Sequence, residues 1–416
     1  MSHPIFMLGA ILFLAYVFLA TFDRTRVPDV LPLIVVGIVL GPSVLGLVSP
    51  ADFGKVGPVM STVALIVVLL IGGLEHELEA LRTALRPTLW LTLTTFVVTF
   101  ALVAGVGVVL LSLPWLVAFS MGAILGGTSS AVVIPVVRTL KLPAYSGTIL
   151  TIESALTDVL TIVLATSLMG AAVVQAGGVS VSRLVGALLS SMTMASVLGV
   201  AAGLTWLVIL RIAPSSEDFV MATIAFALLV YGIADSLGFN GGIGVLAFGL
   251  TLSNWRSMGL HRIPGLSEAS FGGLRHRDRA ANRQGQFLLK VFFFVYLGIS
   301  IPFRDGRLVA LACATVVAVY AARHLIVWLT VDTGRLQPGE TAALCALAPK
   351  GLAAAVLAAQ PRLLGLAGGE AVEDFAFMVV FASIVLTAIM IAAARLEPVR
   401  ARYARMTKAP GNRATA

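Results

Sequence analysis

Charged residues are scarce in this chain. Asp, Glu, Lys and Arg make up 12% of its 416 residues, and 59% of the residues are apolar; a soluble domain carries about 25% charged residues. So few charges exclude a soluble enzyme and a disordered chain. Cysteine is scarce as well. Its two cysteines, Cys313 and Cys345, lie within apolar stretches and provide no disulfide framework.

Long apolar runs are abundant instead. Many extend for about 20 residues, the length at which a helix crosses the hydrocarbon core of a bilayer. We predict an all-α polytopic membrane protein with thirteen transmembrane helices, the first of which is retained as a span and not cleaved as a signal peptide. The predicted spans are 4–22, 28–48, 56–74, 88–111, 115–137, 148–174, 184–210, 217–235, 240–254, 286–303, 308–331, 341–361 and 374–394.

The distribution of basic residues predicts the orientation. With thirteen spans, twenty of the 28 Lys and Arg residues fall on one side of the membrane, many of them in the loop from Trp255 to Gln284, and five fall on the other side. Basic loops remain in the cytoplasm. We therefore expect a cell (inner) membrane protein with its N-terminus outside and a short basic tail, residues 396–416, inside. The basic residues form no stripe with interleaved aromatics, which argues against a nucleic-acid partner.

Two predicted spans contain residues that interrupt a helix. The fifth holds the stretch Gly126 to Ser130 followed by Pro135, and the twelfth holds the stretch Pro349 to Gly351. Broken helices at corresponding positions of two repeats indicate an ion or substrate site in transporters. The two spans are seven apart, which predicts two inverted six-helix repeats, spans 1–6 and 8–13. For either position alone, a kink in an ordinary packed helix is the alternative.

Four charged residues lie within apolar spans, where charge is costly and usually functional. Glu153 and Asp158 lie in the sixth span, Arg323 in the eleventh and Lys350 in the twelfth. The two acids are five residues apart and point about 140° away from each other around a helix, so they are poorly placed to share one ion. One can pair with a base while the other faces a water-filled cavity. Thr157 offers Asp158 a neutral oxygen ligand, so Asp158 is the predicted ion site. Two purely structural ion pairs are the alternative.

In five stretches the chain resembles the monovalent cation/proton antiporter superfamily. The stretches occur in the right order and together the resemblance covers nearly the whole chain. They are RVPDVLPLIVVGIVLGPSVLGLV (26–48), GAILGGTSSAVVIPVVRTLKLP (122–143), ESALTDVLTIVLA (153–165), FFFVYLGISI (292–301) and APKGLAAAVLA (348–358).

This resemblance implies specific roles for the four charges. Asp158 matches the acid that alternately binds a cation and a proton. Glu153 matches an acid that pairs with an arginine of the eleventh span, here Arg323, and Lys350 matches a basic residue at the break of the twelfth span. The resemblance also implies that the discontinuous helices 5 and 12 cross beside helix 6.

A division into two moving parts follows from the same resemblance. The membrane exchanger domain, residues 1–395, is expected to contain a mobile core of helices at 88–174 and 308–394. Helices at 4–74 and 184–303 are expected to form the dimerisation scaffold, so we expect a homodimer. Because few residues follow the last predicted span, any regulatory module is expected to come from a separate subunit.

Two positions depart from the family pattern and leave the ion selectivity open. Thr157 stands where electroneutral exchangers usually have Asn and electrogenic ones Asp. The break of the fifth span reads Thr128, Ser129 and Ser130, where the sodium/proton exchanger branch typically reads Thr-Asp-Pro. We expect a monovalent cation to bind at Asp158 with oxygens from Thr157 and from these three residues, and we expect no transition metal and no cofactor.

The predicted function is secondary active exchange of Na⁺ or K⁺ for H⁺ by alternating access, and not an enzymatic reaction. With one titratable carboxylate in the moving site, exchange is expected to be electroneutral. A gated potassium efflux pathway and a membrane scaffold or sensor without transport are the alternatives. An antiporter exchanges ions without net current, whereas a scaffold shows no cation-dependent proton flux.

Overall fold

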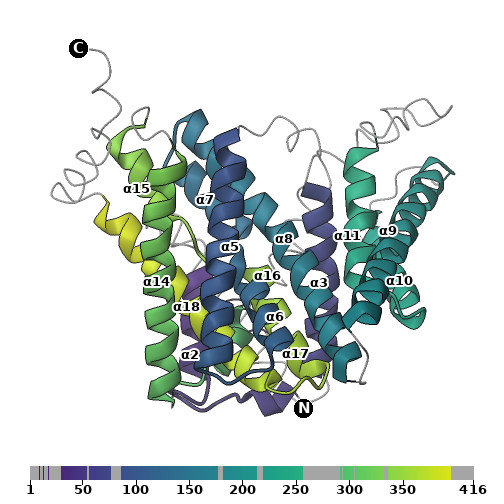
Figure 1. Ribbon diagram of the computed structural model, residues 1–416, viewed down its shortest axis with the longest axis horizontal. Coiled ribbons are helices and arrows are strands. Elements are labelled where there is room, and N and C mark those ends of the chain that lie inside the picture. Colours follow the sequence, from purple (N-terminus) through teal and green to yellow (C-terminus); the bar gives the residue numbers. More distant parts are fainter. Residues whose placement is uncertain are drawn as a thin grey trace.

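The computed structural model describes residues 30–53, 56–75, 86–176, 181–212, 219–255, 291–331 without 293 and 304, and 336–394, together with residues 9, 13 and 17. All regular structure in this part of the chain is helical (Figure 1). The helices are α2 (Val30–Leu40), α3 (Val56–Glu75), α5 (Arg86–Val109), α6 (Trp115–Gly126), α7 (Ser130–Thr139), α8 (Ala144–Ala176), α9 (Val181–Ile212), α10 (Phe219–Ser236), α11 (Gly241–Asn254), α14 (Gly306–Thr330), α15 (Pro338–Ala346), α16 (Leu352–Ala358), α17 (Gln360–Leu363) and α18 (Gly369–Ala393), with a short 3₁₀ helix η1 (Pro50–Phe53). Residues 291–292 and 294–300 are also helical.

The helices follow the predicted spans from the second onward. Five stretches are long and apolar enough to cross a bilayer by themselves, namely Thr88–Val109, Tyr145–Val174, Ser190–Leu210, Gly306–Thr330 and Gly369–Ala393. The prediction of an all-α polytopic membrane protein is therefore confirmed. The first predicted span, 4–22, lies almost wholly outside the described residues, so the total of thirteen stays a prediction.

Two helix ends differ from the predicted ones by five residues or more. α2 ends at Leu40, although the second span was expected to continue to residue 48; Gly41 and Pro42 follow it, and proline has no N–H to continue the helix. α18 begins at Gly369, five residues before the predicted start. Its first turn contains Glu370, and a carboxylate is favourable at the positive end of a helix.

Both predicted interruptions are present. The fifth span consists of α6 and α7, separated by residues 127–129, and the twelfth consists of α15 and α16, separated by residues 347–351. α6 ends at a Gly-Gly pair, and Gly127 is extended. α15 starts with a capping box in which Glu340 accepts a hydrogen bond from the backbone N–H of Gln337. Each interrupted span is therefore two short helices with an extended segment between them.

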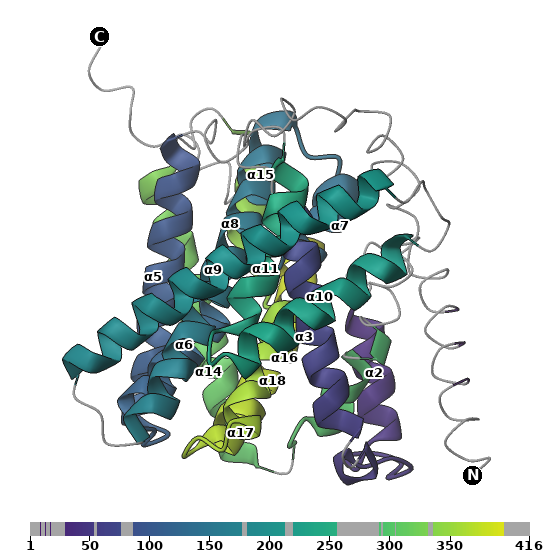
Figure 2. The same cartoon turned by 90° about the vertical axis from the view of Figure 1, so that its right-hand side faces the viewer.

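The helices form two groups of neighbours. In one group α5, α6, α7, α8 and α14 to α18 pack against one another; in the other, α11 packs against α3, α9 and α10 (Figures 1 and 2). The long helix α8 lies between them, because it contacts α6 and α7 on one side and α9 and α11 on the other. Movement of one group against the other stays a prediction.

Two close helix crossings repeat the same pattern in different parts of the chain. At one, Gly37 of α2 faces Gly298, and at the other, Gly73 of α3 faces Gly249 of α11. In each case a Cβ on the glycine would collide with the carbonyl oxygen three residues before the partner glycine, for example Leu246 for Gly73 at 2.7 Å. Small residues allow such close approach in membranes. The two crossings thus have the same glycine-to-glycine geometry, as expected for a chain with two inverted repeats.

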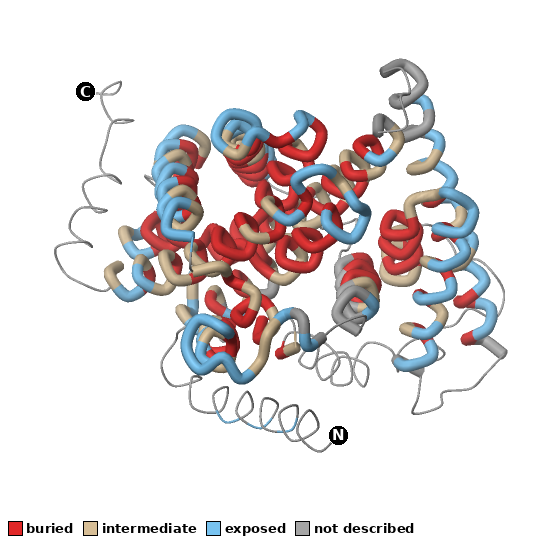
Figure 3. Tube along the Cα trace, turned by 90° about the horizontal axis from the view of Figure 1, so that it is seen from below, coloured by how far each residue is buried: buried red, intermediate tan, exposed pale blue. Residues whose placement is uncertain are grey.

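Burial is concentrated in the middle of the bundle, as Figure 3 shows. The outer faces of the peripheral helices expose large apolar side chains such as Trp90, Val97, Val197 and Leu229. Apolar side chains on the outside suit a helix bundle whose surroundings are lipid tails. The buried polar residues cluster instead around the two interrupted spans.

The glycine crossings make a prediction for stability. Gly298→Ala places a methyl group against the backbone of α2 and should destabilise the protein by about 1–3 kcal/mol, the usual cost of overpacking. Gly105→Ala on α5, where nothing lies within 4 Å, is the matched control and should be neutral or stabilising by up to about 1 kcal/mol. Thermal unfolding of both variants in detergent checks this. Equal melting temperatures would show that the crossing tolerates a side chain.

Candidate ion-binding site

The two interrupted spans cross at their extended segments. The backbone N–H of Ser129 donates a hydrogen bond to the carbonyl oxygen of Pro349 at 2.9 Å. The segments are so close that a Cβ on Gly351 would collide with the hydroxyl of Ser129. The crossing lies inside the bundle, between the halves of the two interrupted spans (Figure 1).

The helix α8 holds the first of these segments with a threonine hydroxyl. Thr157 Oγ1 accepts from the backbone N–H of Thr128 at 3.0 Å, and the hydroxyl oxygens of the two residues are also 3.0 Å apart. Both residues are buried. An extended segment has backbone groups without helix partners, and Thr157 satisfies one of them. The sequence predicted Thr157 and Thr128 as ion ligands, and here they hydrogen-bond each other.

Asp158 lies at the N-terminal end of α7. Its Oδ2 accepts from the backbone N–H of Ser130 at 3.2 Å and also from the Ser130 hydroxyl. Ser130 is the first residue of α7, and the N-terminus of a helix favours negative charge because its first N–H groups are unpaired. Asp158 is partly exposed, in contrast to its buried neighbour Thr157. The Asp158 carboxylate is therefore hydrogen-bonded at the end of a helix and still partly exposed.

Lys350 connects the two breaks. The residue is 2% exposed, and its Nζ donates to the carbonyl oxygen of Gly127 at 2.8 Å. Its backbone N–H donates to the hydroxyl of Ser383 on α18 at 2.9 Å. The ammonium group belongs to the second break and the carbonyl to the first, so this charge-assisted bond ties one extended segment to the other.

Glu153 and Arg323 form a bidentate ion pair at a different face of α8. Arg323 Nη1 and Nη2 donate to the two carboxylate oxygens at 2.6 and 2.9 Å, and both residues are buried. Arg323 Nε also donates to the carbonyl oxygen of Leu344 near the end of α15 at 2.7 Å. One guanidinium thus joins α14 to α8 and to the first half of the twelfth span.

The structure brings all the predicted site residues into one region but divides them into two sets. Glu153 and Arg323 join three helices to one another, and the other residues lie at the crossing of the two extended segments. Glu153 faces α14 while Asp158 faces α7, as their five-residue spacing requires. Sequence reasoning missed the partners that have no charge: Ser383, and the carbonyl groups of Gly127 and Leu344. Nothing in their residue types signals these contacts. Within the described residues no group of three or more His, Cys, Asp and Glu side chains is placed to hold a metal ion.

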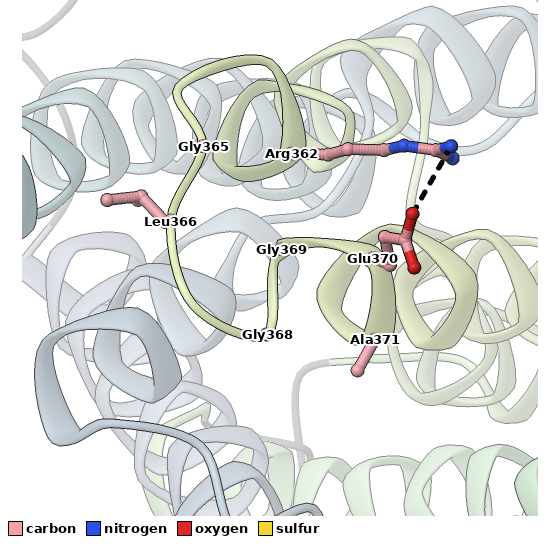
Figure 4. Close-up of a pocket in the computed structure, with 7 residues that line it drawn as sticks. All are labelled: Arg362, Gly365, Leu366, Gly368, Gly369, Glu370 and Ala371. Atoms are coloured by element: carbon pink, nitrogen blue, oxygen red, sulfur yellow. Dashed lines mark ion pairs between the residues drawn. The ribbon is translucent and has the colours of Figure 1, made fainter.

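A separate hollow of about 500 Å³ lies at the connection between α17 and α18 (Figure 4). The side chain of Arg362 points toward Glu370 across it, with 3.4 Å between Nη2 and Oε1. Both side chains are largely exposed, and such pairs contribute about 0–1 kcal/mol. Its lining contains none of the residues of the crossing, so the hollow is not a part of the candidate site.

Two discontinuous helices that cross beside a partly exposed carboxylate define a class of protein. Secondary transporters with inverted repeats place their ion sites where half-helices meet in this way, because the half-helix ends supply partial charges and unpaired backbone groups. The fold and the crossing therefore indicate a secondary transporter.

Comparison with known proteins identifies the family. Residues 9–394 match the sodium/hydrogen exchanger family, transmembrane. The K(+)/H(+) antiporter NhaP2 of Shewanella sp. (strain ANA-3) is 25% identical over 404 residues, which are 95% of this chain and 67% of that protein. The Na(+)/H(+)-K(+) antiporter GerN of Bacillus cereus is 28% identical over 235 residues, 55% of this chain and 58% of that protein.

The fold is similar to that of a solved structure, the sodium proton antiporter MjNhaP1 from Methanocaldococcus jannaschii at pH 8. The TM-score is 0.75 with 21% identity, and the match covers 94% of this chain and 98% of that chain. This chain belongs to the sodium/hydrogen exchanger family, a family of membrane transporters and not of enzymes. The resemblance found in the sequence is thereby confirmed.

The ion pair of Glu153 and Arg323 makes a prediction for a double-mutant cycle. Glu153→Gln should destabilise the protein by about 3–5 kcal/mol, because it leaves a buried guanidinium charge unpaired. Arg323→Gln added to that variant should cost much less than it does alone, apart from the loss of the bond to Leu344. Thermal unfolding of the two single variants and the double variant measures the coupling. Fully additive losses would contradict a direct interaction.

Proposed function

We propose that this chain exchanges a monovalent cation, Na⁺ or K⁺, for H⁺, with Asp158 as the exchange site. The observation that carries the proposal is the position of the Asp158 carboxylate at the N-terminal end of α7, beside the crossing of the two extended segments. The family, and the antiport activity for which the relatives NhaP2 and GerN are named, support exchange as the reaction.

The chemistry of the site supports competition between the two ions. A carboxylate with neighbouring hydroxyl oxygens is a set of hard ligands, which suits an alkali cation. Thr157, Thr128, Ser129 and Ser130 supply the neutral oxygens in this proposal. A proton on Asp158 removes the negative charge that attracts the cation, so one site holds either ion but not both. Such mutual exclusion couples the two fluxes.

The division of the bundle into two groups of helices supports alternating access as the mechanism of this exchange. The group around α5, α6, α8, α14 and α18 carries the crossing, and we assign the group of α3, α9, α10 and α11 to the scaffold and to a homodimer interface. Movement of the first group against the second exposes Asp158 to one side of the membrane at a time. The distribution of basic loops supports an N-terminus outside the inner membrane.

The charges around the crossing support an electroneutral stoichiometry. Arg323 neutralises Glu153 through a bidentate contact, and Thr157 stands where a second acid would be required for a second proton. Asp158 is then the one carboxylate of the predicted site that changes its proton occupancy. One cation moves in one direction for one proton in the other.

The exchange site makes the first functional prediction. Asp158→Asn should abolish cation-dependent proton flux in proteoliposomes loaded with a pH dye, tested with Li⁺, Na⁺, K⁺ and Rb⁺ in turn, because the amide neither carries the charge nor binds the proton. Glu370→Gln, at a largely exposed acid, is the control and should retain exchange. Both variants should elute as monodisperse protein. Residual exchange by Asp158→Asn would falsify the assignment.

The stoichiometry makes the second functional prediction. In proteoliposomes clamped at several membrane potentials with a suitable ionophore, the rate and end-point of the cation-driven pH change should not depend on potential, because no net charge moves in a cycle. End-points that shift with voltage would mean that a second proton is carried. Lys350 is then the first residue to substitute, since it is the remaining buried base at the crossing.

A further inference from the structure

The hydroxyl of Thr161 is buried without a hydrogen-bond partner. Thr161 lies on α8 and is 2% exposed, and its Oγ1 has no donor or acceptor in reach among the described residues. An unpaired buried polar group costs about 1–3 kcal/mol. Valine has nearly the same shape without this cost, so a threonine here needs a function that offsets it.

Several other threonines in the bundle direct their hydroxyl to their own helix. Thr166, Thr251 and Thr315 each donate to the carbonyl oxygen four residues earlier at 2.8 Å. The Thr161 hydroxyl is turned toward the break of the fifth span instead. Its Oγ1 lies so close to Gly127 that a Cβ on this glycine would collide with it. The side chain thus presents its oxygen to the extended segment.

This oxygen lies one helical turn from the proposed exchange site. Thr161 follows Asp158 by three residues and Thr157 by four, so the three side chains share a face of α8. Gly127, which Thr161 contacts, is the C-cap residue that directly follows α6, and the last carbonyl groups of a helix lack helix partners. The carbonyl oxygen of Gly127 itself accepts from Lys350. An unpaired hydroxyl therefore faces the negative end of a half-helix.

We propose that Thr161 is an additional ligand for the transported cation and determines the affinity of exchange for that cation. The inference rests on the proposed function and deepens it. The cation is bound by Asp158 and reaches the Thr161 oxygen when the extended segment moves during the transport cycle. In this proposal the partner of the Thr161 hydroxyl is the ion.

A ligand role predicts a dependence on ion size. Protein oxygens replace water molecules that a cation loses on binding. Smaller cations hold their water more strongly, so the loss of one protein oxygen should weaken binding more for Li⁺ and Na⁺ than for K⁺ and Rb⁺. A role in helix packing alone would affect all cations equally.

The test compares Thr161→Val and Thr161→Ser in proteoliposomes with an internal pH dye, with each of the four cations titrated from outside. Thr161→Val should raise the KM for the transported cation about five- to tenfold, equivalent to about 1–1.4 kcal/mol, with a maximal rate within about twofold of the wild type. Thr161→Ser keeps the oxygen and should restore the KM. Thr88→Val, which removes another buried hydroxyl without a described partner, at the start of α5, is the matched control and should leave the KM unchanged.

Two results would overturn the ligand role. One is an unchanged KM in Thr161→Val; the other is a lower maximal rate at an unchanged KM, which would show that the residue acts in packing. Asp158→Asn is measured in parallel to separate the two proposals. If Asp158→Asn is inactive while Thr161→Val resembles the wild type, the ligand role alone fails. If Asp158→Asn still exchanges ions, the proposed exchange site fails.

Discussion

The crossing of the two interrupted spans places backbone groups without helix partners inside the helix bundle, and the rest of the structure depends on how those groups are satisfied. Each unpaired N–H or C=O costs several kcal/mol where no water is available. Ser129 and Pro349 pair across the crossing, Thr157 accepts from Thr128, and Lys350 donates to Gly127. The side chains around the crossing therefore have a structural task before any transport task. The irregular backbone is tolerated because α8 and the second break supply the missing partners.

The four charged residues within the spans are divided between holding the bundle together and contacting the crossing. Arg323 joins Glu153 to the end of α15, so one base fixes the position of α14, α8 and the first half of the twelfth span. Glu153 and Arg323 are both buried, so separating them would leave two unpaired charges in the core at a high cost in free energy. The ion pair therefore holds the helices that it joins in fixed positions. Lys350 and Asp158 instead contact groups at the breaks, a carbonyl oxygen in one case and the first N–H of α7 in the other. The ion pair that holds the helices together thus lies next to two charged side chains, Lys350 and Asp158, that contact the backbone at the breaks.

The sequence predicted the architecture well because its signals are local. Apolar runs, the glycines at 126–127 and Pro349 each act on their own segment, so both breaks and most helix ends could be placed. The start of α18 was placed too late because Glu370 counts against a span in hydropathy but is favourable in the first turn of a helix. The charged residues of the site could be predicted from the sequence, because a charged residue within an apolar span is easily recognised. Uncharged partners such as Ser383 and the Leu344 carbonyl depend on which helices meet, and no local pattern carries that information.

The strengths of these contacts explain how an ion can act on the crossing. The bonds between Thr128 and Thr157, next to Asp158, join hydroxyl and backbone groups, and a neutral bond of this kind is worth about 0.5–1.5 kcal/mol net. A cation that draws the same oxygens toward itself competes with bonds of comparable strength, whereas the bidentate pair of Glu153 and Arg323 is much harder to break. Occupancy of Asp158 can therefore rearrange the extended segment without loosening the supporting helices. Because Ser129 and Lys350 link that segment to the second break, a change at one half of the crossing must move the other half as well. In the exchange that we propose, the ion shifts both repeats together, and this movement couples the two fluxes.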